Sequence, residues 1–259
     1  MYEVLSQDYD RFVNWKNRLA FEIPFIEKQI SALEGSKTQP LDILDAACGT
    51  GMHAIALAQR GHRVSGADLY DEMVQVSRRN AENADVNVRF STAAFGELAS
   101  VFGENAFDMV FCLGNSLPHL LSAEALIAAL RDFAACLRPG GMVLIQNRNF
   151  DAVMQQRDRW MEPQVHREGS EEWIFQRFYD FLPEGLIHFN IVTLKNNGAG
   201  GWVSSVVSTS LRPQLQAELA AELLHAGFER IRNYGSMNGE EFSPDNSGNL
   251  ILTGLKKKP

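Results

Sequence analysis

Residues 41–53 have the sequence Leu41-Asp-Ile-Leu-Asp-Ala-Ala-Cys-Gly-Thr-Gly-Met-His53. This is the pattern of a short apolar strand, followed by a glycine turn and the start of a helix. A strand that opens into a helix through glycines leaves backbone N–H groups free and lets a ligand approach the main chain closely. The stretch therefore predicts the floor of a site for a nucleotide-like cofactor.

Strand and helix patterns alternate outward from this stretch as far as residue 150. Because parallel strands need crossover helices, this alternation predicts an α/β fold with a doubly wound, mostly parallel, Rossmann-like sheet. Arg138-Pro-Gly-Gly141 has the composition of a tight turn. The sheet is expected to have seven strands, at 41–46, 63–68, 86–91, 107–113, 142–146, 228–234 and 250–255.

The flanking segments predict four regions. Residues 1–36 should form an N-terminal helical cap, with Pro24 breaking its helix, and residues 37–150 the cofactor-binding core. After Phe150 the pattern becomes extended and aromatic-rich, which favours an antiparallel β insertion over residues 151–212 that forms a lid over the substrate. Residues 213–259 should supply a helix and the closing strand pair of the core.

Composition excludes several classes of protein. The 259 residues are 45% hydrophobic and 22% charged, as in an ordinary globular protein, and the net charge of −8 argues against a nucleic-acid partner. No stretch approaches the roughly 18 apolar residues of a membrane helix, and the N-terminal residues do not resemble a secretory leader. Cys48, Cys112 and Cys136 lie in apolar patterns, which favours free thiols in a cytoplasmic protein. No spacing of His and Cys suggests a metal site.

Spacing to the next acidic residue narrows the choice of cofactor. Asp68 ends the second strand, about 20 residues after the turn, where its carboxylate can accept both ribose hydroxyls. An acidic residue at that position can bind the ribose of NAD and the ribose of S-adenosylmethionine equally well. The turn is not G-x-G-x-x-G, because Ala47 and Ala54 occupy the first and third glycine positions. Asp45 in the turn and the polar loop after residue 113 favour S-adenosylmethionine.

Residues 41–147 resemble the class I S-adenosylmethionine-dependent methyltransferases. Two further segments, Cys112-Leu-Gly-Asn-Ser-Leu-Pro-His-Leu120 and Asn147-Arg-Asn-Phe-Asp151, are similar to those of the glycine and sarcosine N-methyltransferases. This resemblance implies S-adenosyl-L-methionine as cofactor and a small-molecule methyl acceptor that bears a carboxylate. It leaves the oligomeric state open.

Several residues are candidates for cofactor binding. Gly49 and Gly51 should allow close backbone approach, Asp68 should bind the ribose, and Asp45 should orient the loop or reach the cofactor's ammonium. Leu69 and Met73 flank the adenine or simply pack in the core. The candidate set is completed by Ala47, Leu113 and Gly114.

The resemblance implies further roles. Arg18 matches an arginine that binds the cofactor's carboxylate, Tyr9 would lie near the sulfonium, and His119 would orient the methionyl end. Many class I enzymes have an Asp at the position of Ala94, and that Asp binds the adenine amino group. Because Ala94 has no such side chain, Phe95 is the residue expected to contact the adenine ring.

The resemblance also assigns two residues to the methyl acceptor. Arg148 matches an arginine that binds the substrate carboxylate. The alternative role for Arg148 is an internal salt bridge, because a buried arginine needs a partner. Asn115 would position the acceptor's polar groups, and its alternative is a role in a turn.

Competing functions stay open at this point. A dehydrogenase is disfavoured by the missing glycine motif. A nucleic-acid base methyltransferase is disfavoured because Gly114-Asn-Ser-Leu117 lacks the Asp/Asn-Pro-Pro-Tyr motif. A non-catalytic S-adenosylmethionine sensor and an enzyme for another small metabolite both fit the sequence.

Overall fold

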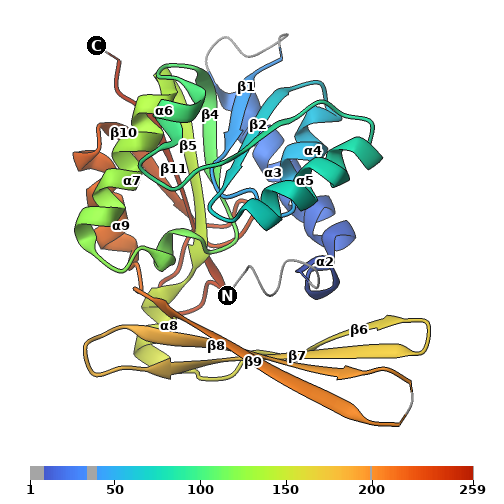
Figure 1. Cartoon of the computed structure of the whole chain (residues 1–259). Coiled ribbons are helices and arrows are strands. Elements are labelled where there is room, and N and C mark those ends of the chain that lie inside the picture. Colours follow the sequence, from blue (N-terminus) through green and yellow to red (C-terminus); the bar gives the residue numbers. More distant parts are fainter. Residues whose placement is uncertain (1–8, 34–39, 199, 259) are drawn as a thin grey trace.

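A computed structural model describes residues 9–33, 40–198 and 200–258, without the side chain of Tyr9. A seven-stranded α/β unit lies above a separate four-stranded sheet in the view of Figure 1. The strand order of the larger sheet is β10-β11-β5-β4-β1-β2-β3. Its strands are β1 (Asp42–Asp45), β2 (Arg63–Asp68), β3 (Arg89–Thr92), β4 (Phe107–Cys112), β5 (Leu137–Arg148), β10 (Phe228–Tyr234) and β11 (Asn249–Lys256).

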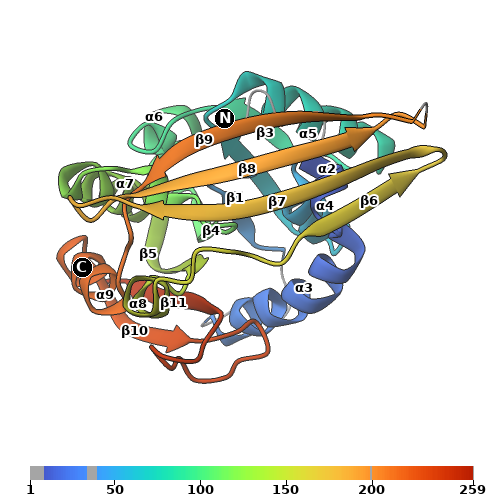
Figure 2. The same ribbon diagram turned by 90° about the horizontal axis from the view of Figure 1, so that it is seen from below.

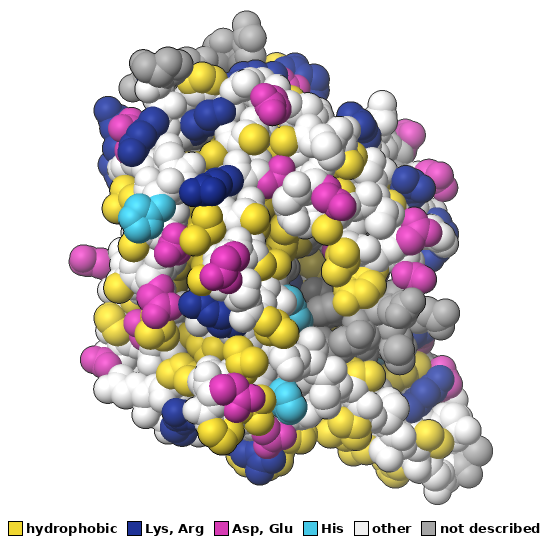
Figure 3. All heavy atoms as spheres, turned by 60° about the vertical axis from the view of Figure 1, so that its left-hand side comes forward, with side chains coloured by type: hydrophobic (Ala, Val, Ile, Leu, Met, Phe, Trp, Pro, Cys, Tyr) yellow, Lys and Arg dark blue, Asp and Glu magenta, His cyan; other side chains and the backbone are white. Residues whose placement is uncertain are grey.

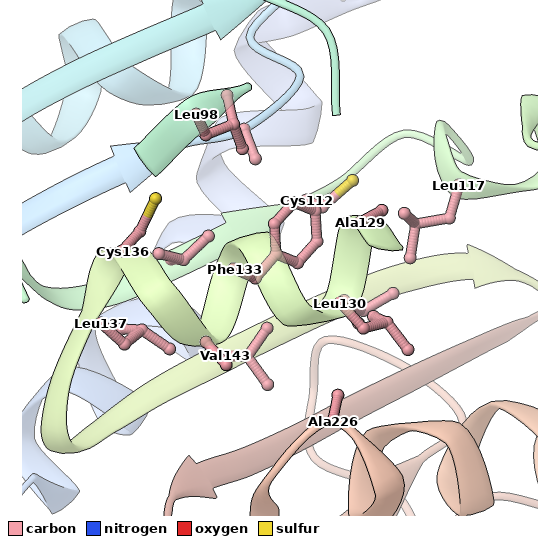
Figure 4. Packing of buried hydrophobic residues seen from close by; sticks show 14 of the residues in the cluster. Leu98, Cys112, Leu117, Ala129, Leu130, Phe133, Cys136, Leu137, Val143 and Ala226 are labelled. Atoms are coloured by element: carbon pink, nitrogen blue, oxygen red, sulfur yellow. The ribbon is translucent and has the colours of Figure 1, made fainter. Parts of the chain in front are cut away.

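Helices cover both faces of this sheet. One face packs against α3 (Trp15–Ala32), α4 (Met52–Ala58) and α5 (Asp71–Asn83). The other face packs against α6 (Leu98–Phe102), α7 (Ala123–Cys136) and α9 (Gln216–His225), and Figure 4 shows Phe133 and Leu130 of α7 in that core. Strands β1 to β5 pair in parallel, whereas β11 pairs antiparallel with both β5 and β10. The predicted doubly wound, seven-stranded fold is therefore confirmed.

The smaller sheet is antiparallel and has the order β6-β7-β8-β9. Figure 2 shows it crossing one end of the α/β unit. It follows α8 (Phe150–Gln156), and its strands are β6 (Gln164–Glu168), β7 (Glu171–Phe181), β8 (Ile187–Asn196) and β9 (Trp202–Leu211). The short α2 (Tyr9–Phe12) lies against it, because the rings of Phe12 and Phe175 meet edge to face at 5.4 Å. The insertion is thus the antiparallel element that the aromatic-rich pattern predicted.

The predicted helix break at Pro24 is wrong. Helix α3 continues through this proline from Trp15 to Ala32. The residues around Pro24, including Ile23, Phe25 and Ile26, are buried against the sheet, and their burial outweighs the local cost of the proline. The interruption lies earlier, between α2 and α3, where Asn14 caps α3 by accepting a hydrogen bond from the Asn17 N–H at 3.2 Å.

The segment Arg138–Gly141 is part of β5 and not a turn before it. The strand begins at Leu137, and the register against β4 shifts between the pairs Phe107–Leu137 and Met109–Met142. Two ion pairs hold the bulged segment beside its neighbours, since the Arg138 guanidinium lies 2.9 Å from Asp42 and 2.8 Å from Asp108. Because of this bulge, β5 begins at Leu137, before the Pro-Gly-Gly sequence that predicted a turn.

Among the residues that the structure describes, no helix is both long and apolar enough to cross a membrane.

Replacing Gly51 by alanine is expected to destabilise the protein by about 2–4 kcal/mol. Gly51 precedes α4 with φ +82°, and an added Cβ would lie 2.8 Å from both the Phe90 ring and the Ser77 Cβ. Gly61→Ala is the matched control, because Gly61 has φ +91° and no heavy atom would meet its Cβ within 4 Å. We expect that control to cost about 1–2 kcal/mol. Urea unfolding measures both variants, and equal losses would show that packing around Gly51 does not matter.

Candidate active site

A cavity of about 470 Å³ opens at the carboxyl ends of β1, β2 and β4. We call it the first cavity. Parallel α/β sheets bind ligands at this edge, because the loops that leave the strands diverge there. The small sheet completes the wall with Thr209 and Ser210 of β9. On the face drawn in Figure 3 the surface is hollowed near its centre, and hydrophobic side chains gather around the hollow.

Asp68 faces the glycine turn from the end of β2. One carboxylate oxygen accepts a hydrogen bond from the Gly49 N–H at 2.9 Å, and the other accepts from the Tyr70 N–H at 3.1 Å. Gly49 has φ +54°, a conformation that glycine adopts without strain. Burial raises the pKa of Asp68, although both backbone N–H groups oppose the shift. Asp68 is thus fixed at the cavity wall, with lone pairs remaining for further donors.

Asp45 is a buried carboxyl group in the same wall, with only 2% of its surface exposed. Within the described part of the chain, its side chain accepts one hydrogen bond, from the Ala47 N–H at 3.4 Å. Burial raises the pKa of Asp45 well above its usual range, and the nearby Asp68 adds to this effect. The charge of Arg18 opposes this shift, but among the described residues no cation forms an ion pair with Asp45. A buried carboxyl group of this kind fits a ligand that brings a positive charge.

Arg18 of α3 belongs to a chain of charged groups. Its Nε lies 3.1 Å from Glu22, and Glu22 also lies 2.6 Å from Nε2 of His53. Burial opposes ionisation of Glu22, but hydrogen bonds from His53 and the charge of Arg18 outweigh it and lower the pKa of Glu22. Burial lowers the pKa of His53 despite that partner. The Nε of Arg18 is therefore engaged by Glu22. The terminal NH2 group of Arg18 lies beside Gly114, since a Cβ added to that glycine would stand 3.6 Å from it.

The far end of the first cavity is largely apolar. Leu69, Met73, Ala94 and Phe95 line it, and the Phe95 ring packs edge to face against Phe133 with centroids 5.5 Å apart. Where many class I enzymes would carry an Asp, the backbone N–H of Ala94 donates to Glu97 at 3.1 Å. An apolar slot with a few polar groups at its rim is typical of an adenine site.

A second cavity, of about 430 Å³, lies between the core and the small sheet. Arg18 and Gly114 line both cavities, so the two adjoin there. Asn115 is in the left-handed region with φ +69°, and its Oδ1 accepts a hydrogen bond from the Arg148 N–H at 2.9 Å. Gln146 supports the same corner, because its Oε1 accepts from the Gly114 N–H at 2.8 Å.

The structure brings most of the sequence-predicted residues to these two cavities. Asn115 and Arg148 line the second one, and the Arg148 side chain is exposed and not buried as its strand position suggested. Gly51 lies outside both cavities, and the side chain of Tyr9 lies outside the described residues. The first cavity is lined by Arg18, Asp45, Ala47, Gly49, Asp68, Leu69, Met73, Ala94, Phe95, Leu113, Gly114 and His119.

Several lining residues were not predicted from the sequence. These are Trp15, His53, Tyr70, Thr209 and Ser210 in the first cavity and Tyr179 in the second. Those on the small sheet carried no local signal, since their strands lie far along the chain from the glycine turn. The sequence offers Ser116 beside Asn115, and Arg177 as one of five arginines that could meet an acidic substrate; the structure places Ser116 in the first cavity and Arg177 in the second. The described residues contain no group of three His, Cys, Asp or Glu side chains that could hold a metal ion.

Comparison with known proteins agrees with this geometry. Residues 43–141 match the model of a methyltransferase domain. The chain is 28% identical over 254 residues to a glycine/sarcosine N-methyltransferase of Parasynechococcus marenigrum, covering 94% of this chain and 80% of that one. It is 27% identical over 203 residues to an enzyme of the same name from Aphanothece halophytica, covering 75% and 74%.

A solved structure shares the fold. It is an S-adenosylmethionine-dependent methyltransferase from Clostridium acetobutylicum, with a TM-score of 0.77, 14% identity and 99% of each chain covered. Residues 43–141 therefore match a methyltransferase domain, S-adenosylmethionine is the cofactor, and the chain as a whole is similar to the glycine/sarcosine N-methyltransferases.

Proposed function

We propose that this enzyme methylates the amine of a small, carboxylate-bearing amino acid. The observation that carries the proposal is Arg148, which lines the second cavity close to the boundary with the first. Among the described residues it forms no ion pair, and its backbone is fixed by Asn115. The names of the relatives support an amino-acid acceptor.

Within the first cavity, the buried acids and Arg18 fit the polar parts of the cofactor. Asp68 would accept hydrogen bonds from the ribose hydroxyls, and Asp45 would pair with the ammonium of the methionyl part. Arg18 would bind the carboxylate through N–H groups that Glu22 does not use. The adenine would lie between the apolar side chains of Leu69, Met73 and Phe95.

When bound, S-adenosylmethionine would supply a methyl group on a positively charged sulfur. An amine lone pair would bond to this carbon as the S–C bond breaks, with S-adenosylhomocysteine and a proton released to solvent as the other products. The protein's residues contribute chiefly by position. Arg148 and Asn115 would hold the acceptor at the junction of the two cavities, where alignment can supply up to about 7–11 kcal/mol. The small sheet would exclude water.

The proposal requires no protein base. Glu22 has a lowered pKa and is already paired with Arg18 and His53, so it stays ionised and engaged. Burial lowers the pKa of His119 to about 4, which keeps this side chain neutral at pH 7. The amine would therefore have to arrive deprotonated, and the rate should rise with pH as the free amine becomes more abundant.

A panel of acceptors tests the proposed function. Purified protein is incubated with labelled S-adenosylmethionine and one acceptor at a time, which is glycine, sarcosine, dimethylglycine, L-aspartate or L-glutamate, with ethanolamine as the matched amine without a carboxylate. We expect transfer to at least one amino acid and none to ethanolamine. Tight binding of S-adenosylhomocysteine without transfer to any amine would instead identify a non-catalytic sensor.

Replacing Arg148 by alanine is expected to raise KM for the amino-acid acceptor about 10- to 100-fold, because a charge-assisted contact is lost. The Kd for S-adenosylhomocysteine should change little. Arg167→Ala is the matched control, since Arg167 is exposed, pairs with Glu172 at 2.7 Å and lines neither cavity. An unchanged KM in the Arg148 variant would refute its role as the anchor.

A further inference from the structure

The second cavity concentrates positive charge in an acidic protein. Among the described residues, its charged lining residues are Arg18, Arg148, Arg177 and Glu22, which is three positive charges and one negative. These four residues sum to +2, whereas the whole chain has a net charge of −8. No Lys, Asp or His from the described part of the chain contributes to the lining.

One of the three arginines is already compensated. Arg18 lies 3.1 Å from Glu22 and packs over the Trp15 ring at 5.2 Å. The excess charge thus belongs to Arg148 and Arg177, which come from different sheets. Within the described ranges, neither of these two side chains forms an ion pair with a carboxylate.

Arg177 is held in the cavity wall without a polar partner. Its guanidinium packs over the Phe12 ring at 4.9 Å, and its Nε is buried with no hydrogen-bond acceptor. Arg148 lines the same cavity. Burial lowers the pKa of Arg177, and the charge of Arg148 lowers it further. A buried donor without an acceptor is unfavourable, and two uncompensated cations repel each other. Such a pair is expected where a ligand supplies the missing anions.

Tyr179 lies close to both arginines. Burial raises the pKa of its hydroxyl, while the positive charges of Arg148 and Arg177 oppose that shift. It stands two residues from Arg177 on the same strand, so the two side chains share one face of the sheet. Tyr179 thus lines the second cavity together with both arginines.

A single carboxylate does not balance this site. A glycine-like acceptor brings one negative charge once its amine is neutral, which would leave one arginine uncompensated. The cavity of about 430 Å³ is also in the range that accommodates ligands much larger than glycine. Apolar side chains of Met161, Phe189 and Ile191 line it beside the arginines and could cover a short carbon chain between two acidic groups.

We propose that the methyl acceptor is a dianionic amino acid of the aminodicarboxylate class, with one carboxylate bound by Arg148 and the second by Arg177. This inference rests on the proposed function, since it assumes an amino-acid acceptor in the second cavity. It adds Arg177 as the residue that selects the second acidic group.

Pairs of acceptors that differ by one charge test this proposal on the unaltered enzyme. L-aspartate is compared with L-asparagine, and L-glutamate with L-glutamine, by kcat/KM and by calorimetric binding to the protein loaded with S-adenosylhomocysteine. For at least one pair, we expect the acid to be favoured over its amide about 10- to 100-fold in both measurements. Calorimetry does not depend on turnover, and the substrate pairs do not depend on any variant folding.

Variants then assign the preference to its residue. Arg177→Gln should reduce the acid-to-amide ratio to within about threefold of unity. Arg167→Gln, on the neighbouring strand but outside the cavity, should leave the ratio unchanged. Equal use of acids and amides by the unaltered enzyme, or a ratio that survives Arg177→Gln, would overturn the dianion inference and leave the proposed function intact. If neither the acids nor the amides bound or were methylated, the dianion inference would fail, and the proposed function would fail only if glycine, sarcosine and dimethylglycine were inert as well.

Discussion

Asp68→Ala is expected to lower the affinity for S-adenosylmethionine and S-adenosylhomocysteine about 100- to 10,000-fold. The proposed ribose contact consists of two hydrogen bonds to a charged carboxylate, each worth about 1.5–3 kcal/mol, and a tenfold change in Kd corresponds to about 1.4 kcal/mol. The substitution also removes the acceptor for the Gly49 and Tyr70 N–H groups, so the glycine turn loses its support. Isothermal calorimetry with S-adenosylhomocysteine measures the loss directly.

Asp71→Ala is the matched control for this experiment. Asp71 is an exposed acid at the start of α5, and its side chain accepts hydrogen bonds from Gln75 at 2.6 Å and Thr92 at 2.9 Å. It lines neither cavity, so its removal should change the Kd by no more than about twofold, as a long-range surface charge does. Circular dichroism verifies that both variants are folded. An Asp68 variant that is folded and binds as tightly as the unaltered enzyme would disprove the ribose contact.

Asp45→Asn is expected to have opposite effects on stability and on binding. Burial raises the pKa of Asp45 in the free protein, so the folded state holds a proton that the unfolded chain releases at about pH 4. Stability therefore falls as the pH rises through the raised pKa, because the ionised carboxylate is buried without a cation. Asparagine does not ionise, so we expect the variant to have the higher Tm at pH 8 and a Tm close to that of the unaltered protein at pH 4.

Cofactor binding should respond in the other direction. The proposed ammonium contact needs the negative charge of Asp45, and its loss should weaken binding of S-adenosylhomocysteine about 100-fold, as for other buried charge pairs. Binding by the unaltered enzyme should strengthen with rising pH and release a proton, whereas binding by the variant should depend less on pH. Calorimetry in buffers of different ionisation enthalpy measures that proton.

Asp42→Asn provides the contrast at the other end of the same strand. The Arg63 guanidinium hydrogen-bonds Asp42 and lowers its pKa, with Arg138 adding to the effect. A carboxylate with a lowered pKa stabilises the fold at pH values above its pKa in the unfolded chain, and this stabilisation is lost as the pH falls. Asp42→Asn should therefore have a lower Tm than the unaltered protein at pH 8. Cofactor affinity should not change, because Asp42 lines neither cavity. An Asp45 variant that is less stable than the unaltered protein at pH 8 would refute the buried, uncompensated carboxylate.

The sequence alone determined the α/β architecture and most of the first cavity. Strand and helix periods are local, so the order of elements in residues 41–147 follows from the spacing of apolar residues. The glycine turn and Asp68 lie at the ends of adjacent parallel strands, and the carboxyl ends of such strands meet at one edge. For this reason the residues predicted from the turn lie together in the structure.

Only the tertiary structure decided the features that depend on burial or on contacts between distant segments. Pro24 remains inside a helix because its neighbours pack against the sheet, which no local propensity reveals. Strand β6 was missed because its residues are mostly exposed and lack an apolar alternation. Arg148 and Arg177 come together from different sheets, and the missing partner of the Arg177 Nε is visible only once the chain is folded. Local spacing therefore predicted a nucleotide-type cofactor site and its strand edge, whereas the two arginines of the second cavity meet only because one sheet packs against the other.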